Sequence, residues 1–355
     1  MSKQSHRAAL IGCGKVGTGE GAGKTQGGFR IGYTHGDMYR NHESVNLVGA
    51  ADIDARNLAA FQKEFNVDAG YIDYVRMLAE VKPDILSICT YVGLHRPMIE
   101  EAVRAGVRGI LCEKPFVQSP ADLKAVCELA DRTGIKICIA HQRTNHPGLE
   151  RARDLYNGGS IGERVAFVYS VENWDLSEMA SHWIDIGRFV HQDDPIEWVM
   201  CQTRVRDTRG FGHAMEDHAL ATWCVSGGGR IVIDAGRALN APWREMLVGS
   251  EGMIGIANES VLYIYDKDGH RLEDYGREKD WETLWLDTMD GLLEWVEGGS
   301  VPVTGLPRTA KTAEAVFAAY HSAEQSDRID FPLDEDFWAI DEWPVEAIAR
   351  RYSAK

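Results

Sequence analysis

Three residues whose side chains can accept or donate a proton follow one another in the second half of the chain, at intervals of four and three positions. Glu178, His182 and Asp185 share one face if residues 178–190 form a helix, because side chains at i, i+3 and i+4 of a helix are neighbours. An imidazole between two carboxylates takes up and releases protons near neutral pH. The spacing predicts either a proton-transfer site or the capped, partly buried polar face of an ordinary helix.

A lysine follows a strand-sized apolar run in the first half. Lys114 stands just beyond Val107–Cys112 (VRGILC), and Pro115 restricts the turn after it. Ligands of doubly wound sheets lie beyond the carboxyl ends of the strands, so a lysine there can bond a ribose or a reacting hydroxyl. Oxidation of a carbinol needs a base for the hydroxyl proton and a donor that steadies the developing alkoxide. The alternative is a lysine that merely faces solvent.

The elements around Lys114 predict a parallel sheet. Apolar runs alternate with helical patterns over the first 141 residues, which is typical of βαβ units. The runs are His6–Ile11, Val45–Ala51, Ile85–Thr90, Val107–Cys112 and Ile135–Ala140, and the helical patterns are Asp54–Phe65, Tyr74–Glu80, Arg96–Ala105 and Ala121–Thr133.

The glycines after the first run match a dinucleotide fingerprint. Gly12 suits the tight turn, Gly14 the close approach of pyrophosphate, and Gly17 the packing of helix on strand. The second strand ends at Asp52, whose carboxylate accepts hydrogen bonds from ribose hydroxyls and repels a 2′-phosphate. The motif therefore predicts NAD rather than NADP, although Arg56 stands close enough in sequence to receive a 2′-phosphate.

The segment behind the fingerprint is longer than usual. Asp52 follows Gly17 by 35 residues, whereas about 20 are typical. The surplus lies in Thr18–Thr34, which is either a surface insertion or a lid or partner contact at the cofactor edge. The GKT at 23–25 resembles the end of an ATP-binding P-loop. That motif needs a glycine where Thr18 stands, so no ATP site is expected.

From Val165 onward the pattern changes to alternating runs joined by glycine turns, which predicts an antiparallel sheet. Helices are expected over Glu178–Val190, Asp287–Glu297 and Arg308–Gln325, and the acidic, aromatic tail from Phe331 is expected to dock on a domain. The predicted strands are Val165–Val171, Trp198–Arg204, Ala219–Cys224, Arg230–Asp234 and Val261–Tyr265.

Composition narrows the class of protein. The length of 355 residues suits two domains, and the net charge of −16 disfavours nucleic acid and anionic lipid as partners. No apolar run reaches the roughly 18 residues of a membrane span, and no signal region is apparent, so a cytoplasmic protein without a membrane partner is expected. Seven cysteines without a C-x-x-C pair predict buried thiols.

One cluster suggests a metal. His213, Glu216, Asp217 and His218 open a predicted strand, where Glu216 and His218 share a face. No third element is matched to them, so no metal site is expected.

Several motifs together resemble the Gfo/Idh/MocA family of NAD(P)-dependent oxidoreductases. Glu113-Lys114-Pro115 resembles the family's EKP motif. Tyr91 replaces a proline that is usual in the family. The resemblance covers roughly residues 7–332, and the order of its motifs makes it specific. The further matching segments are Leu86–Thr90 with His95, Gly158–Glu163, Ser181–Arg188, Val248–Ile254 and Pro302–Ala318.

The resemblance implies a fold of class α/β, with a Rossmann doubly wound parallel sheet in residues 1–141 and a C-terminal α+β domain in 142–355 built on a large, mostly antiparallel open sheet. NAD would span the first domain, and a pyranose, inositol or related substrate would lie between the two. Glu178 replaces the first acid of the family's usual Asp-x-x-x-His-x-x-Asp pattern.

The resemblance and the motifs assign three sets of site residues. The catalytic set is Lys114, His182, Asp185 and Glu178. The cofactor set is Gly12, Gly14, Lys15, Val16, Gly17, Asp52, Thr90, His95, Glu113 and Lys114. The substrate set is Lys114, Arg143, Trp174, Asp185 and His182.

Three functions stay open on this basis. The first is an NAD-dependent dehydrogenase of a sugar, inositol or sugar derivative, with Lys114 and His182 at the reacting carbinol. The second is a glycoside-cleaving enzyme that oxidises its substrate transiently with tightly held NAD. The third is a non-catalytic NAD-binding sensor. The resemblance also implies a homo-oligomer, either a dimer or a tetramer.

Overall fold

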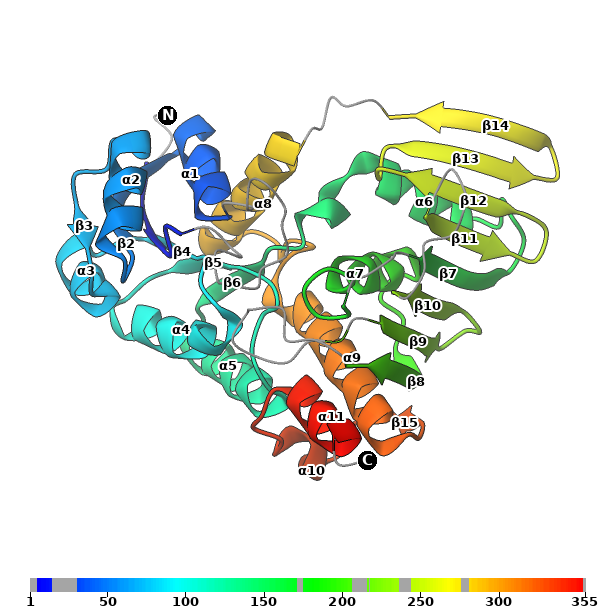
Figure 1. Ribbon diagram of the computed structural model, residues 1–355. Helices are drawn as coiled ribbons and strands as arrows, with labels where there is room; N and C mark the ends of the chain where they lie inside the picture. Colours follow the sequence, from blue (N-terminus) through cyan, green and yellow to red (C-terminus); the bar gives the residue numbers. More distant parts are fainter. Residues whose placement is uncertain are drawn as a thin grey trace.

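Two β-sheets organise the chain (Figure 1). The structure is a computed structural model that describes residues 5–14, 31–170, 175–205, 216, 218–235, 244–275 and 281–353. One sheet has six parallel strands and the other has nine mostly antiparallel strands. The predicted α/β fold class is therefore confirmed.

The six-stranded sheet has the order β3-β2-β1-β4-β5-β6. The order reverses between β1 and β4, and ligands of such sheets bind at this point. The strands are β1 (His6–Ile11), β2 (Val45–Ala51), β3 (Gly70–Tyr71), β4 (Ile85–Ile88), β5 (Gly109–Cys112) and β6 (Lys136–Ile139).

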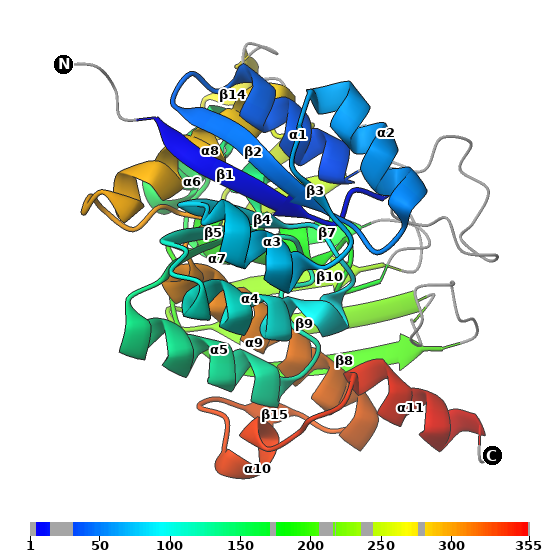
Figure 2. The ribbon, with the colours of Figure 1, turned by 90° about the vertical axis from the view of Figure 1, so that its left-hand side faces the viewer.

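Helices cover both faces of this sheet, which explains why its strands are continuous apolar runs (Figure 2). Asp54, Asp73 and Ser119 cap the first turns of α2, α3 and α5, and these caps mark where each helix begins. The helices are α1 (Ile31–Asn41), α2 (Ala55–Phe65), α3 (Tyr74–Val81), α4 (His95–Arg104) and α5 (Pro120–Thr133), with the short 3₁₀ helix η1 (Val92–Leu94) before α4.

A helix from the far end of the sequence completes one face. α8 (Trp281–Val296) packs beside α1, with the rings of Trp285 and His35 4.6 Å apart. It is longer than the predicted helix Asp287–Glu297. Sequence periodicity places a helix in the chain, but it does not say which sheet the helix covers.

The nine-stranded sheet has the order β14-β13-β12-β11-β7-β10-β9-β8-β15, in which only β7 and β10 pair in parallel. All five predicted strands are present. Four strands, β11, β12, β14 and β15, were not predicted. For β11 and β12 the reason is that their short hairpin resembles a turn in the sequence. The strands are β7 (Arg164–Ser170), β8 (Ile196–Arg204), β9 (His218–Val225), β10 (Arg230–Asp234), β11 (Glu245–Gly249), β12 (Met253–Ala257), β13 (Val261–Asp266), β14 (Gly269–Asp274) and β15 (Ile329–Asp330).

Among the described elements, helices cover one face of this sheet (Figure 1). They are α6 (Pro147–Asn157), α7 (Ser181–Val190) and α9 (Leu306–Gln325), and the 3₁₀ helix η2 (Gln142–Asn145) leads from β6 into α6. The inward side chains of β8 and β9 alternate with more exposed ones, as expected for a sheet with one covered face.

The C-terminal tail docks as predicted. It forms α10 (Glu335–Trp338) and α11 (Pro344–Ser353), and it buries Phe337 and Trp343. The Ala121 N–H donates a 3.0 Å hydrogen bond to the Ile340 carbonyl, which ties the tail to α5.

The cysteines and the helices bear on two predictions made from composition. All seven cysteines are free thiols, five of them buried, and burial raises the pKa of Cys138 to about 12. Within the ranges the structure covers, none of the helices combines the length and apolarity that crossing a membrane requires.

Candidate active site

A groove of about 340 Å³ crosses the carboxyl ends of the parallel strands at the point where their order reverses. Glu178, from the second half of the chain, lies at one end of it. Lys15, Val16 and Gly17 fall outside the described residues. The predicted cofactor residues that line the groove are Gly12, Gly14, Asp52, Thr90, Glu113 and Lys114.

Glycine at position 12 is required by the backbone. Its φ is +97°, and an added Cβ would lie 2.3 Å from the Cys89 carbonyl oxygen. At Gly14 an added Cβ would approach Asn57 Nδ2 at 3.1 Å, so a side chain would narrow the groove. Gly32, in the first turn of α1, would place a Cβ 2.3 Å from the Gly12 carbonyl oxygen. Gly32 thus provides a close contact between the helix and the turn after β1 that was not predicted from the sequence.

Asp52 braces the turn that it borders. One carboxylate oxygen accepts a 2.7 Å hydrogen bond from the Cys13 N–H, and the other accepts a 2.8 Å bond from the Asp54 N–H. Carboxylate oxygens have capacity for further donors, so Asp52 can still accept from ribose hydroxyls. Arg56, the possible 2′-phosphate ligand, is paired with Asp54 at 2.8 Å. These contacts fit NAD better than NADP.

His95 lies beneath the groove rather than in it. Its ring is fully buried, with Nδ1 2.9 Å from the Phe116 carbonyl oxygen and Nε2 3.0 Å from the Thr90 carbonyl oxygen. The first turn of α4 directs the ring inward, so His95 braces two loops. The structure therefore does not place His95 among the residues that line the groove, although Thr90 itself lines it.

Glu113 joins the groove to a buried polar network. Its carboxylate lies 3.0 Å from His35 Nε2 and accepts a 3.2 Å hydrogen bond from the Lys114 N–H. His35 Nδ1 lies 2.8 Å from Ser87 Oγ, which lies 2.6 Å from the Tyr39 hydroxyl. The network fixes α1 to β4, through Ser87, and to the residue that precedes Lys114. The sequence signal for His35 and Tyr39 is their i, i+4 spacing on an otherwise apolar helix face.

Lys114 connects the two halves of the chain. Its Nζ lies 3.1 Å from Glu178 Oε2. Burial lowers the pKa of Lys114, but Glu178 and Glu113 outweigh that effect, so the net shift of its pKa is upward. Lys114 is therefore an ammonium group that donates hydrogen bonds and carries positive charge at the end of the groove.

Glu178 does not lie on the helix with His182 and Asp185. α7 begins at Ser181, and Glu178 belongs to the preceding turn. The Asp175 carboxylate accepts hydrogen bonds from the Ser177 hydroxyl and the Glu178 N–H, which stabilises that turn. The prediction that Glu178 shares a helix face with His182 and Asp185 is therefore wrong.

His182 is a buried neutral imidazole. Its Nδ1 lies 3.4 Å from Nδ1 of His141, and the two rings meet edge to face. Burial, with His141, Arg143 and Lys114 nearby, holds the pKa of His182 well below its usual range. The ring is therefore unprotonated at neutral pH, as a proton acceptor must be.

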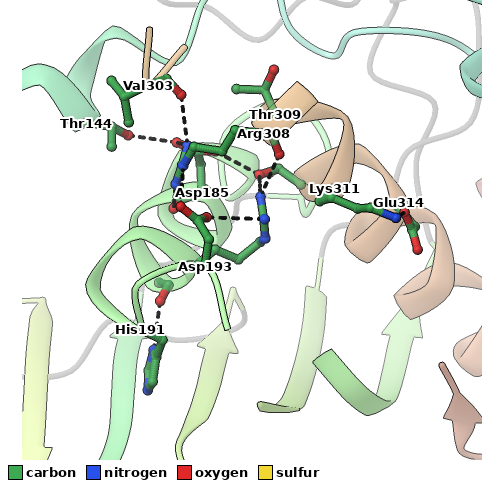
Figure 3. A network of polar contacts seen from close by, with 12 residues as sticks. Thr144, Asp185, His191, Asp193, Val303, Arg308, Thr309, Lys311 and Glu314 are labelled. Carbon is green, nitrogen blue, oxygen red and sulfur yellow. Dashed lines mark hydrogen bonds and ion pairs between the residues drawn. The ribbon is translucent and has the colours of Figure 1, made fainter. Parts of the chain in front are cut away.

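Asp185 is fully buried and its carboxylate is fully bonded (Figure 3). It accepts hydrogen bonds of 2.7 Å from both Thr144 and Thr312, and Arg308 Nη1 lies 2.8 Å away. Despite burial, Arg308 and His141 lower the pKa of Asp185. The carboxylate pins α7 to α9, so the predicted contact of Asp185 with substrate is not what the structure shows.

Arg143 lies over an aromatic stack. Its guanidinium is paired with Glu259 and lies 5.2 Å from the ring centre of Trp183. Trp183 Nε1 donates a 2.6 Å hydrogen bond to Glu245, and Tyr169 stacks on the indole at 4.0 Å. Trp174, the predicted aromatic substrate contact, lies outside the described residues. Trp183 was not singled out in the sequence, although it directly follows His182.

The cluster that suggested a metal is only partly described. Glu216 is buried and accepts hydrogen bonds from the Leu176 N–H at 2.7 Å and the Tyr320 hydroxyl at 2.9 Å. His213 and Asp217 lie outside the described residues. Across the described ranges, no group of three or more His, Cys, Asp or Glu side chains is placed to hold a metal ion.

Glu216 makes the stability of the fold depend on pH. Burial and the nearby Asp175 raise its pKa from 4.5 to about 8. The unfolded chain ionises this group above its ordinary pKa while the folded protein keeps the proton, so stability falls as pH rises between these two values. As pH rises through this window, we expect the stability of Glu216→Gln to increase relative to that of the wild type. The urea midpoints of the two proteins measure this difference. A pH-independent difference between the two proteins would contradict this.

Known proteins share this architecture. Residues 6–141 match Gfo/Idh/MocA, an oxidoreductase family with an NAD-binding Rossmann fold. D-apiose dehydrogenase from Paraburkholderia graminis is 25% identical, with 91% of this chain and 89% of that protein covered. D-glucoside 3-dehydrogenase from Escherichia coli is 23% identical, with 93% and 99% covered.

A solved structure has a similar fold over most of the chain. The WlbA dehydrogenase from Bordetella pertussis, in complex with NADH and UDP-GlcNAcA, matches with a TM-score of 0.73 and 21% identity, covering 93% of this chain and 100% of that one. The strand order and the glycine turn beside Asp52 both indicate a dinucleotide-binding domain, and they lie in the segment that matches the family. Residues 6–141 thus match the NAD-binding Rossmann domain of the Gfo/Idh/MocA oxidoreductases, and the chain is similar to two sugar dehydrogenases over about nine-tenths of its length.

Proposed function

We propose that this protein is an NAD-dependent dehydrogenase that oxidises a hydroxyl of a sugar, a polyol or a glycoside. The observation that carries the proposal is the position of Lys114. It ends the cofactor groove, pairs with Glu178, and also lines a small cavity beside His141. The relatives named as D-apiose and D-glucoside 3-dehydrogenases support a carbohydrate substrate.

The groove fits a dinucleotide. A Cβ at Gly12 would collide with the Cys89 backbone, and Asp52 lies where the adenosine ribose of NAD would bind. Bound NAD supplies the hydride acceptor for the reaction. Gly12, Gly14, Asp52 and Thr90 would hold it.

The reacting carbinol needs a donor and a base. The Lys114 ammonium would donate a hydrogen bond to the carbinol oxygen and stabilise the charge that develops there. His182, held neutral, would accept the hydroxyl proton at Nε2, because its Nδ1 faces His141. Glu178 would then hold Lys114 in place rather than take part in proton transfer.

A second candidate is glycoside cleavage through transient oxidation with retained NAD, and the relative named D-glucoside 3-dehydrogenase favours a glycoside substrate for it. We would denature the purified protein without added cofactor and identify the released nucleotide by mass spectrometry. Stoichiometric NAD would direct the first assays to glycoside cleavage. An empty protein would direct them to NADH formation with apiose, glucosides and inositols. Failure of both NAD and NADP to bind would overturn the proposal.

Asp52 is expected to set the preference for NAD. Hydrogen bonds to a charged group contribute about 1.5–3 kcal/mol, so Asp52→Ala should weaken NAD binding about 10- to 100-fold. NADP binding should change little, because the loss of contacts is offset by removal of charge repulsion. Isothermal titration with both dinucleotides measures this, with Asp52→Asn as the isosteric control. An equal loss of both affinities would contradict a selective role.

The face of the nine-stranded sheet that no described helix covers is proposed to bind a second copy of this chain. Cross-strand partners form one row of mostly apolar side chains on that face, and Met200 and Leu272 at its two ends are 50% and 56% exposed. A face of this kind, without charges along the row, suits an isologous dimer. The row is Met200, Thr222, Val232, Val168, Met246, Gly255, Tyr263 and Leu272.

A charged side chain in this row is expected to weaken the association of the two copies. Val232→Lys should shift the mass measured by light scattering toward that of the monomer, because the lysine would be buried without a partner in the interface. Val301→Lys changes an exposed valine away from the sheet and serves as the control. An oligomer that resists Val232→Lys would argue against this face.

A further inference from the structure

His141 lies next to His182, between the end of β6 and the start of η2. Both rings are buried, at 4% and 5% exposure. Their Nδ1 atoms are 3.4 Å apart, so one nitrogen carries the proton and the other accepts it if both rings are neutral. This pair consists of two bases side by side, in a place where the sequence pattern had suggested carboxylates.

Neither predicted carboxylate takes the place of His141. Glu178 is paired with Lys114, outside the helix of His182. Asp185 is saturated by Thr144, Thr312 and Arg308. Among the described contacts, the polar neighbour of the His182 ring is therefore another imidazole.

The charges around the pair differ between its two members. His182 faces Arg143, Lys114 and His141, all of which disfavour a proton on its ring. His141 faces the cations Arg308 and Lys114 but also the carboxylates Asp185 and Glu113, which favour one. A positive charge is therefore better accommodated on His141 than on His182.

We propose that His141 and His182 form a two-imidazole proton relay, in which His141 receives the proton that His182 takes from the substrate. This inference rests on the proposed function. In the resting pair, His182 carries its proton on Nδ1 and His141 carries its proton on Nε2. The carbinol O–H proton goes to His182 Nε2, while the Nδ1 proton of His182 moves to His141 Nδ1. His182 ends neutral, His141 ends as an imidazolium, and the hydrogen and electron pair of the C–H bond leave to the cofactor.

A small cavity offers the proton a next step. A space of about 20 Å³ adjoins His141 and Lys114 and is lined by the hydroxyl residues Ser177, Ser181 and Thr309. That volume holds about one water molecule. The buried Ser181 Oγ has no hydrogen-bond partner within the described part of the chain. A water here would accept a proton from His141 without leaving the protein interior.

The first test needs no substrate. Imidazole nitrogen NMR of the ¹⁵N-histidine-labelled full chain would be followed from neutral to acidic pH, with His141→Asn and His182→Asn assigning the signals. We expect His182 to carry its proton on Nδ1 and His141 to become an imidazolium first on acidification. Protonation of His182 before His141, or a His182 ring protonated on Nε2 at neutral pH, would overturn the relay.

The second test uses the sugar that the assays above identify. Asparagine keeps an acceptor near the Nδ1 position but cannot carry the proton, so His141→Asn should lower kcat about 100-fold, the lower end of the range for a proton-transfer group, with little change in KM. The acidic limb of the kcat/KM profile should move to lower pH, because inactivation would then require protonation of His182 itself. His191→Gln, which alters a buried histidine away from the groove, controls for lost stability.

The outcomes separate the two proposals. An unchanged kcat or an unmoved acidic limb in His141→Asn would overturn the relay and leave the dehydrogenase intact. Absence of turnover by the wild type with any sugar would count against the proposed function, while the NMR titration would still decide how the pair shares its proton.

Discussion

Lys114→Ala is expected to lower kcat/KM about 100- to 1,000-fold, the range seen when a single donor to a developing oxyanion is removed. Alanine leaves the alkoxide without its cation and leaves Glu178 without its partner at the end of the groove. NAD affinity should fall much less, because Gly12, Asp52 and the other groove residues remain. Initial rates with the identified sugar and titration with NAD measure the two effects separately.

Two further variants sharpen this prediction. Lys114→Arg keeps the charge, but its planar guanidinium does not replace a compact ammonium, so most of the activity should still be lost. Lys124→Ala removes a lysine that is paired with Glu335 on the surface and should leave turnover unchanged. Turnover by Lys114→Ala within about threefold of the wild type would contradict any role of Lys114 in stabilising charge.

Asp185→Ala is expected to destabilise the fold by about 3–5 kcal/mol, since removing one member of a buried ion pair leaves the other charge without compensation. Arg308 Nη1 would lose both carboxylate oxygens that it contacts, and Thr144 and Thr312 would lose their acceptor. Urea unfolding of the full chain, followed by tryptophan fluorescence, gives the change in the free energy of unfolding.

A conservative variant separates structure from chemistry at this position. Asp185→Asn keeps the shape and one acceptor oxygen but removes the charge opposite Arg308, so it should recover part of the lost stability. Neither variant should alter NAD affinity in the folded protein, because Asp185 does not line the cofactor groove. A loss below about 1 kcal/mol for Asp185→Ala would show that the network in Figure 3 carries little of the stability.

Local signals in the sequence were sufficient for most of the fold. The parallel strands are apolar because helices cover both of their faces, and this pattern is visible without coordinates. The same holds for Asp54, Asp73 and Ser119, which cap helices close to the predicted starts. The short hairpin of β11 and β12 was missed because its strands are stabilised by their neighbours in the sheet rather than by a pattern of their own.

The candidate site was predictable where it depends on strand ends. Gly12, Asp52 and Lys114 each follow a strand of one parallel sheet, so they must meet at its carboxyl edge. Their chemistry is also local, because a required glycine, an acid and a lysine are recognisable by residue type and position.

By itself, the sequence determined the α/β class, the NAD fingerprint and the lysine at the end of β5, since these depend on periodicity and on residues close along the chain. Only the tertiary structure decided the partners of the ionisable side chains. Glu178 pairs with Lys114, Asp185 with Arg308, and His182 with His141, each across 41 or more positions. Such pairings depend on how sheets and helices pack, and burial rather than spacing then sets which group holds a charge.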